Sequence, residues 1–158
     1  MMRKLVVACV VAAAIGASAA GAGAQTCTGT AVTINSVAPG AVNFGTATDP
    51  MFQTGYVDAT VTVTTQAQRN RTIKLCVRST DASMGTSTPP GYTKPLSTLL
   101  TGPAGTLVPV TTTYQFLQQK TTVGNVAAVY TLTVRITLSW TNDWPGNYLA
   151  HLQFAAWR

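Results

Sequence analysis

Apolar and polar residues alternate along several stretches of this chain, which is the period of a β-strand with one buried face. Residues 56–65 alternate Val and Ala with Thr and Asp, and residues 73–78 alternate Ile, Leu and Val with Lys, Cys and Arg. Tyr114 and Phe116 mark a further strand. No segment after residue 24 has a helical period, so the pattern predicts an all-β protein. The longest alternating stretch has one apolar face, formed by Tyr130, Leu132, Val134, Ile136, Leu138 and Trp140.

Segments rich in turn-forming residues separate these strands. Residues 66–71 are polar and include Asn70, which predicts a hairpin between the strands on either side. Residues 79–95 and 101–106 are rich in Ser, Thr, Pro or Gly and are predicted to be loops. A turn over residues 141–147 precedes the last strand. About seven strands at intervals of roughly ten residues predict an antiparallel β-sandwich. One face of the last strand carries Tyr148, Ala150, Leu152, Phe154 and Ala156.

The N-terminus has the three regions of a secretory leader. Arg3 and Lys4 precede an apolar run over residues 5–15, and small residues follow up to Ala22-Gly23-Ala24. This order predicts a signal peptide over residues 1–24 and a single domain over residues 25–158. An uncleaved membrane anchor over residues 5–24 would have nearly the required length. Its second half is Ala and Gly with a cleavage signature, so cleavage after Ala24 is favoured.

The composition leaves little room for catalysis. Charged residues make up only 9% of the chain, with four Asp, one His and no Glu. Such a chain has few groups for acid-base chemistry or for binding a metal ion, so we expect no catalytic residue, no metal and no cofactor. His151 with Asp143 and a hydroxyl nucleophile would suit acyl transfer, but no nucleophile motif accompanies them. We therefore expect His151 to face solvent on the polar side of the last strand.

Two cysteines remain after removal of the leader, Cys27 and Cys76. An even pair in an exported domain predicts a disulfide, with a free thiol or an intermolecular bridge as the alternative. Closing a loop of this size stabilises the fold by about 4 kcal/mol in the chain-entropy model. Because Cys76 alternates with Lys74 and Arg78, the bond is expected on the outer or edge side of a sheet.

Basic and aromatic residues suggest a ligand surface. Removal of the leader lowers the formal net charge from +6 to +4. A basic cluster could bind an acidic polysaccharide or lipopolysaccharide, although a charged face that resists aggregation explains it without a ligand. Nucleic acid is not expected as a partner of an exported protein. Exposed tryptophans could stack on sugar rings, whereas Trp140 is expected in the core. The candidate ligand contacts are Arg69, Arg71, Lys74, Arg78, Trp144 and Trp157.

Three segments in order resemble the spore coat protein U family and the related archaic (Csu-type) chaperone-usher pilins. The first is Val42-Asn43-Phe44-Gly45-Thr46, which is similar to the family's apolar-x-Phe-Gly element. The second is residues 55–65 followed by residues 72–77, which resemble the family's strand pair with a cysteine in the second strand. The third is residues 145–154, which resemble its closing Gly-x-Tyr strand.

The resemblance implies an immunoglobulin-like sandwich that lacks one strand. A periplasmic chaperone supplies that strand, and a neighbouring subunit later replaces it. In such pilins an extension before the first cysteine is the donated strand, but here only Gln25 and Thr26 would precede Cys27. Two residues cannot fill a groove that needs about five. The resemblance therefore implies a subunit that accepts a strand without donating one, as a tip or non-polymerising subunit does.

The expected function is a non-enzymatic structural or adhesive subunit of a surface fibre or coat, with roles in adhesion and biofilms. Its expected partners are a periplasmic chaperone, an usher and neighbouring pilin subunits, and its expected location is the periplasm in transit and then the cell surface. The alternative is a self-contained secreted domain that binds surface glycans. The strand acceptor is expected along the edge of the last strand, at Tyr148, Ala150, Leu152 and Phe154.

Overall fold

The computed structural model describes residues 26–40, 42–46, 54–86, 91–139, 141–143 and 147–158. The expected leader, Trp140 and Trp144 lie outside these residues. Strands dominate the described chain, and a short 3₁₀ turn, η1 (Leu96–Thr98), lies between two of them. All strand pairs are antiparallel. The all-β fold expected from the alternation is therefore confirmed.

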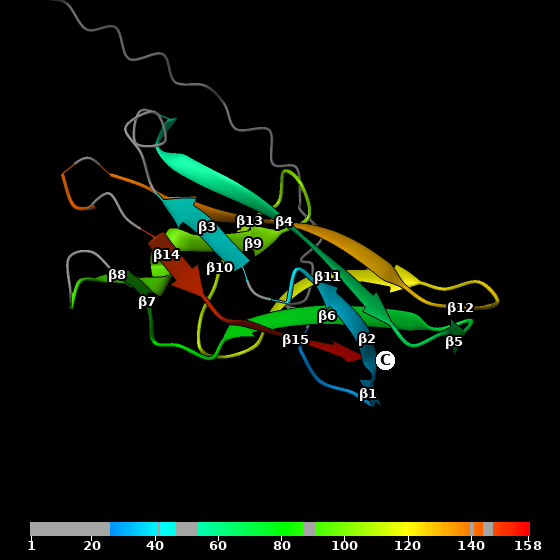
Figure 1. Cartoon of the computed structure of the whole chain (residues 1–158). Coiled ribbons are helices and arrows are strands. Elements are labelled where there is room, and N and C mark those ends of the chain that lie inside the picture. The colour runs from blue at the N-terminus through cyan, green and yellow to red at the C-terminus, as the bar shows by residue number, and fades with distance from the viewer. Residues whose placement is uncertain (1–25, 41, 47–53, 87–90, 140, 144–146) are drawn as a thin grey trace, which may run out of the picture.

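The first sheet has five strands in the order β10-β9-β13-β4-β2 (Figure 1). Its central pair, β4 and β13, is long because both segments alternate apolar residues with Thr, which suits a strand with one buried face. Val61 and Val63 of β4 pair with Leu132 and Tyr130 of β13, and all four are buried. The bounds are β2 (Ile34–Ala38), β4 (Tyr56–Thr65), β9 (Leu99–Gly102), β10 (Val108–Pro109) and β13 (Val129–Thr137).

The opposite layer contains two four-stranded sheets, in the orders β1-β15-β6-β11 and β3-β14-β7-β8. The two sheets are continuous along the chain, since β14 leads into β15 through His151 and β6 is followed closely by β7. A small ribbon of β5 (Gln68–Arg69) and β12 (Asn125–Val126) forms one end of the molecule (Figure 1). The other bounds are β1 (Ala31–Val32), β3 (Val42–Thr46), β6 (Thr72–Ser79), β7 (Ser83–Thr86), β8 (Thr93–Pro95), β11 (Gln115–Thr121), β14 (Asn147–Ala150) and β15 (Leu152–Trp157).

One hydrophobic core lies between the two layers. Ile73, Leu75 and Val77 of β6 enter it from one side, and the inward residues of β4 and β13 enter it from the other. The hydroxyl of Tyr130 donates a hydrogen bond of 2.8 Å to the main-chain carbonyl of Ile73. This bond joins the two layers through the core, because Tyr130 belongs to β13 and Ile73 to β6.

The strand order is that of an immunoglobulin-like sandwich, in which one sheet holds strands A, B, E and D and the other holds C, F and G. β2, β4, β13 and β9 follow the order A-B-E-D, and β6 and β15 occupy the positions of C and F. In the described residues, the position of G beside F is occupied only at its two ends, by β1 next to β15 and by β3 next to β14.

Three of the local expectations were wrong. Residues 66–71 do not form a hairpin, because β4 and β6 belong to opposite layers and the segment crosses between them. Two strands that pair in one sheet and two strands that face each other across a core show the same alternation of apolar and polar residues. The alternation alone therefore cannot distinguish a hairpin from a crossing between layers. Residues 79–95 are not only loop, since β7 and β8 pair there. The last strand is divided at His151 into β14 and β15.

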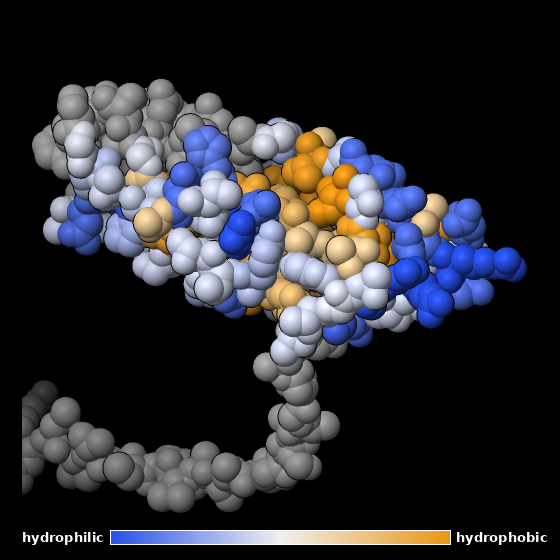
Figure 2. Space-filling view, turned by 90° about the horizontal axis from the view of Figure 1, so that it is seen from below, coloured by the Kyte–Doolittle hydropathy of each residue, from blue (hydrophilic) through white to orange (hydrophobic). Residues whose placement is uncertain are grey.

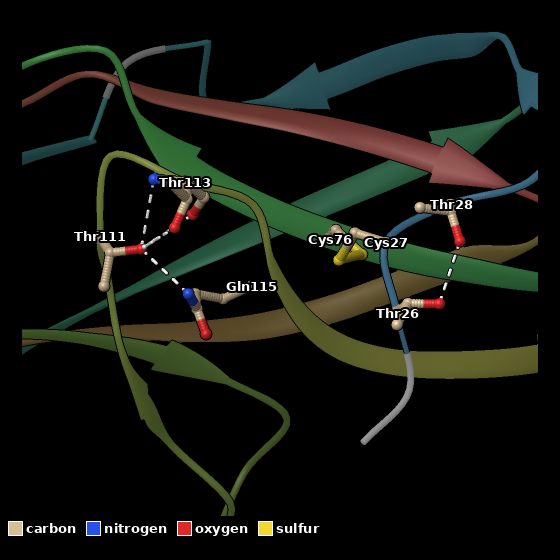
Figure 3. The surroundings of a disulfide bond; sticks show 7 residues. All are labelled: Thr26, Cys27, Thr28, Cys76, Thr111, Thr113 and Gln115. Atoms are coloured by element: carbon tan, nitrogen blue, oxygen red, sulfur yellow. Dashed lines mark hydrogen bonds between the residues drawn. A yellow bond between two sulfur atoms is a disulfide. The ribbon is translucent and has the colours of Figure 1, made fainter. Parts of the chain in front are cut away.

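Cys27 and Cys76 form the expected disulfide, with a Cα–Cα distance of 6.1 Å. Cys76 lies on β6, between β15 and β11, so the bond is on a central strand and not at an edge. It faces away from the core residues of β6; Cys76 is fully buried, whereas Cys27, in the segment that runs beside β6, is partly exposed (Figure 3). In the loop beside it, Thr111 Oγ1 accepts hydrogen bonds from the Thr113 amide and the Gln115 side chain. The disulfide holds the start of the domain against the outer face of β6.

Replacing both Cys27 and Cys76 with Ser should lower the free energy of unfolding by about 4 kcal/mol, because the unfolded chain regains the freedom of an open loop. Urea denaturation measures this change. Reducing the wild-type protein is the matched control and should give the same loss. A loss below about 1 kcal/mol in both would show that the bond does not stabilise the fold in this way.

Replacing Tyr130 with Phe should cost about 1 kcal/mol at neutral pH, because the carbonyl of Ile73 loses a buried donor. Burial also raises the pKa of Tyr130 from 10.0 to about 12. As the pH rises, the Tyr130 hydroxyl therefore loses its proton in the unfolded chain before it does so in the folded protein. The contribution of this hydroxyl to the free energy of unfolding is complete below pH 10 and is lost as the pH rises towards 12. Urea denaturation across this range should show a steeper loss in the wild type than in Tyr130→Phe. Equal slopes would contradict the prediction.

Candidate functional site

The edge of β15 that faces away from β6 is only partly covered. β1 pairs with its far end, where Val32 lies opposite Ala156. β3 pairs with β14 up to Ala150. Between these two contacts, no strand of the described residues pairs with residues 152–155 on this side. At about 3.3 Å per residue the gap is about 13 Å long.

The uncovered main-chain groups belong to Leu152 and Phe154. In an antiparallel strand, successive residues direct their N–H and C=O groups to opposite edges. Arg158 exchanges two main-chain hydrogen bonds of 3.0 Å with Thr30 on the β1 side, whereas the carbonyl of His151 accepts one from the Thr80 amide on the β6 side. Even-numbered residues therefore face the gap. Leu152 and Phe154 present two N–H and two C=O groups to it.

The side chains around the gap are apolar. Leu152 and Phe154 are partly buried and pack against the core, and Ile34 and Val37 of β2 do the same from the other layer. Figure 2 views the molecule from the side of β15 and β2 and shows an apolar patch in the middle of this face. The site therefore combines unpaired main-chain groups with partly exposed apolar side chains.

The path of the N-terminal segment creates this gap. After β1 the chain leaves β15 and joins the other layer, where the Thr33 carbonyl accepts a hydrogen bond of 2.8 Å from Gln66 and β2 pairs with β4. It then returns to the layer of β15 as β3, beside β14. One segment thus changes layer twice, and on the side away from β6 it leaves the middle of β15 without a neighbouring strand among the described residues.

The open edge is shorter than the sequence suggested. Tyr148 and Ala150 were expected along it together with Leu152 and Phe154. They lie in β14, which has β3 on one side and β7 on the other, so its edges are already paired. Only Leu152 and Phe154 of the expected set face an uncovered edge.

The candidate ligand residues lie in two places. Arg69 and Arg71 are exposed at the end of the molecule formed by β5 and β12. Lys74 and Arg78 lie on the outer face of β6. The Nε of Arg78 donates a 2.6 Å hydrogen bond to Gln153, and its guanidinium lies 4.9 Å from the centre of the Tyr114 ring. The structure therefore does not gather the four basic residues into one patch.

Trp157 is partly buried on this same outer face. It packs edge-to-face against Tyr114, with ring centres 5.2 Å apart. This contact accounts for Trp157 without a sugar ligand. Trp144, its expected companion in a stacking platform, lies outside the described residues.

Asp143 and His151 have separate partners. Both carboxylate oxygens of Asp143 lie 2.6 Å from the ammonium of Lys94, and these two side chains are almost fully buried. The Tyr92 hydroxyl and the Ser139 amide also donate to Asp143. His151 is exposed, as expected, and its Nδ1 lies 2.7 Å from Asp81. The Lys94–Asp143 pair ties β8 to the turn after β13, and no sequence motif marks it.

Two further features are absent from the part of the chain that the structure describes. No group of three or more His, Cys, Asp or Glu side chains there is arranged to hold a metal ion. A helix with the length and hydropathy to cross a membrane is also absent from those residues.

No protein-family model matches this sequence, and no curated protein or solved structure is significantly similar to it. The proposed function therefore depends on the geometry of the open edge.

Amide hydrogen exchange should reveal the open edge as an alternating pattern. The amides of Leu152 and Phe154 should exchange quickly because they face the gap, while those of Gln153 and Ala155 should be protected because they face β6. Ala156, beside β1, is the internal control and should exchange more slowly than Phe154. Equal protection at Phe154 and Ala155, measured by NMR, would mean that the edge is covered.

Proposed function

We propose that this protein is an exported, non-enzymatic structural or adhesive subunit of a chaperone-usher surface assembly. In this proposal it accepts a β-strand from a partner beside Leu152 and Phe154. The observation that carries the proposal is the uncovered middle of β15, where no strand of the described residues occupies the position of strand G between β1 and β3.

A donated strand would meet both needs of this site. Its main chain would pair with the N–H and C=O groups of Leu152 and Phe154, and its alternate apolar side chains would cover Phe154 and Ile34. Without a partner, an apolar edge of this kind promotes aggregation. A periplasmic chaperone would protect it in transit, and an usher and a neighbouring subunit would complete the exchange at the cell surface.

Two features support export. The N-terminus has the order of a secretory leader, with Arg3 and Lys4 before the apolar run and Ala24 at the cleavage position. The Cys27–Cys76 disulfide suits an oxidising compartment such as the periplasm or the cell exterior. An adhesive role at the surface is consistent with both.

A donor peptide provides the test. A short synthetic peptide that alternates Val with Lys should stabilise the oxidised domain by about 2.7 kcal/mol at a hundred times its Kd, as mass action requires. Replacing Leu152 and Phe154 with Ser should abolish this gain and lower the periplasmic yield. Thermal unfolding with and without the peptide measures the effect.

The matched control changes the neighbouring exposed side chains, His151→Ala with Gln153→Ala, which point away from the core. This variant should respond to the peptide as the wild type does. If the wild-type domain is monomeric and cooperatively folded and the peptide does not raise its Tm, the acceptor proposal is wrong. A self-contained glycan-binding domain would then be the better account.

A further inference from the structure

One end of the molecule consists of two turns held together, residues 68–72 and residues 121–126. The β5 and β12 strands pair there, with Arg69 opposite Asn125. The side chain of Asn70 accepts a 2.9 Å hydrogen bond from the Gly124 amide. The Thr122 hydroxyl donates one of 2.6 Å to the Gln68 carbonyl. These bonds make the two turns a single built surface.

Basic side chains gather around this end. Arg69 and Arg71 come from the first turn and Lys120 from the strand before the second, and all three are exposed. Arg158 joins them, since its guanidinium donates a 2.9 Å hydrogen bond to the Gln68 side chain. Figure 2 shows strongly hydrophilic residues at the end of the molecule where this surface lies. We call these four residues the basic end.

No ion pair among the described residues neutralises the basic end. Asp58 binds Arg135, Asp81 binds His151 and Asp143 binds Lys94. Each described aspartate therefore has its partner elsewhere. Arg71 and Arg158 also line one shallow cavity of about 400 Å³, with Thr30 and Thr72 as the other walls. Two guanidinium groups beside hydroxyls suit a phosphate, whose oxygens accept several hydrogen bonds.

The second turn carries an exposed apolar residue. Val123, next to Gly124 in the second turn, is 83% exposed, and Val126 in the same hairpin is 49% exposed. Val is unfavourable in turns, where Gly, Asn and Asp are preferred. Because Gly124 bonds to Asn70, Val123 lies beside the turn that carries Arg69 and Arg71.

We propose that the basic end docks on a lipid surface with anionic phosphate headgroups. The guanidinium groups of Arg69, Arg71 and Arg158 bind headgroup phosphates, and Val123 enters the boundary between headgroups and acyl chains. A soluble polyanion would satisfy the charges and leave Val123 in water, whereas a lipid surface accommodates both. This inference is independent of strand acceptance, since it uses neither Leu152 nor Phe154.

Vesicle co-sedimentation of the oxidised protein tests the proposal. The protein should bind vesicles of phosphatidylglycerol and phosphatidylcholine and not vesicles of phosphatidylcholine alone, and high salt should release it. Each basic residue removed should weaken binding about fivefold, so Arg69→Gln with Arg71→Gln should weaken it roughly 25-fold. Val123→Ser should weaken it several-fold.

Arg135→Gln is the matched control, because it removes the same charge from the outer face of the other sheet. It should change vesicle binding less than twofold. If Arg135→Gln and Arg69→Gln weaken vesicle binding equally, the effect depends only on net charge and the proposal is wrong. A second result would also overturn the proposal. If the protein does not bind the vesicles but binds heparin tightly, and Val123→Ser does not change heparin binding, the basic end fits a polyanionic glycan. An unchanged Tm shows that the variants are folded. An unchanged response to the donor peptide shows that strand acceptance is intact, so the vesicle test and the donor-peptide test can fail independently.

Discussion

The path of residues 26–46 determines which edges of the sandwich are covered. Every N–H and C=O group at a sheet edge needs a partner, and here one segment serves two layers in turn. It pairs with the end of β15, then with β4, then with β14, and the Cys27–Cys76 bond fixes where it starts. A segment of this length cannot follow one layer throughout and also cover the other. The gap beside Leu152 and Phe154 is the direct result of this division.

The open edge and the basic end would bind their partners through different interactions. At the open edge, main-chain polar groups and apolar side chains are both unsatisfied, so a suitable partner is an extended chain that supplies both. At the basic end, the backbone is satisfied by the pairing of β5 with β12, and what lacks a partner is charge. The two surfaces can therefore be occupied at the same time. A protein with both surfaces could bind a donated strand at the open edge and a lipid surface at the basic end.

Much of the fold could be predicted from the sequence because side-chain alternation directly reports which face of a strand is buried. The segments of β4, β6 and β13 were recognised in this way, and the pairing of Cys27 with Cys76 followed from there being no other cysteine after the expected leader. Alternation does not report which strand lies beside which, so the crossing at residues 66–71 was mistaken for a hairpin. The strands β7 and β8 were missed because Ser, Thr and Pro obscure any period there.

The candidate site was predicted in part for the same reason. The inward face of the last strand was correct for Ala150, Leu152, Phe154 and Ala156. The pairing of β14 with β3, which is distant in sequence, was not foreseen. The Lys94–Asp143 ion pair could not be predicted from the sequence either, because the two residues lie far apart in the chain and neither belongs to a recognisable motif. Arg158 joins the basic end only because β15 pairs with β6 in a register that brings it near Gln68.

The shortness of β1 has a consequence for the kinetics of any strand that binds beside β15. β1 contributes only two residues to the sheet, yet its covalent tether through Cys27 keeps it near β15 at a high effective concentration. An incoming strand longer than the gap must compete with this internal segment. It can pair first with Phe154, where no strand of the described residues competes, and then replace β1 one residue at a time. The energy barrier to exchange is thereby divided into small steps. Reducing the disulfide would free one end of β1, which would still be held at its other end by β2, so that an incoming strand would displace β1 more easily.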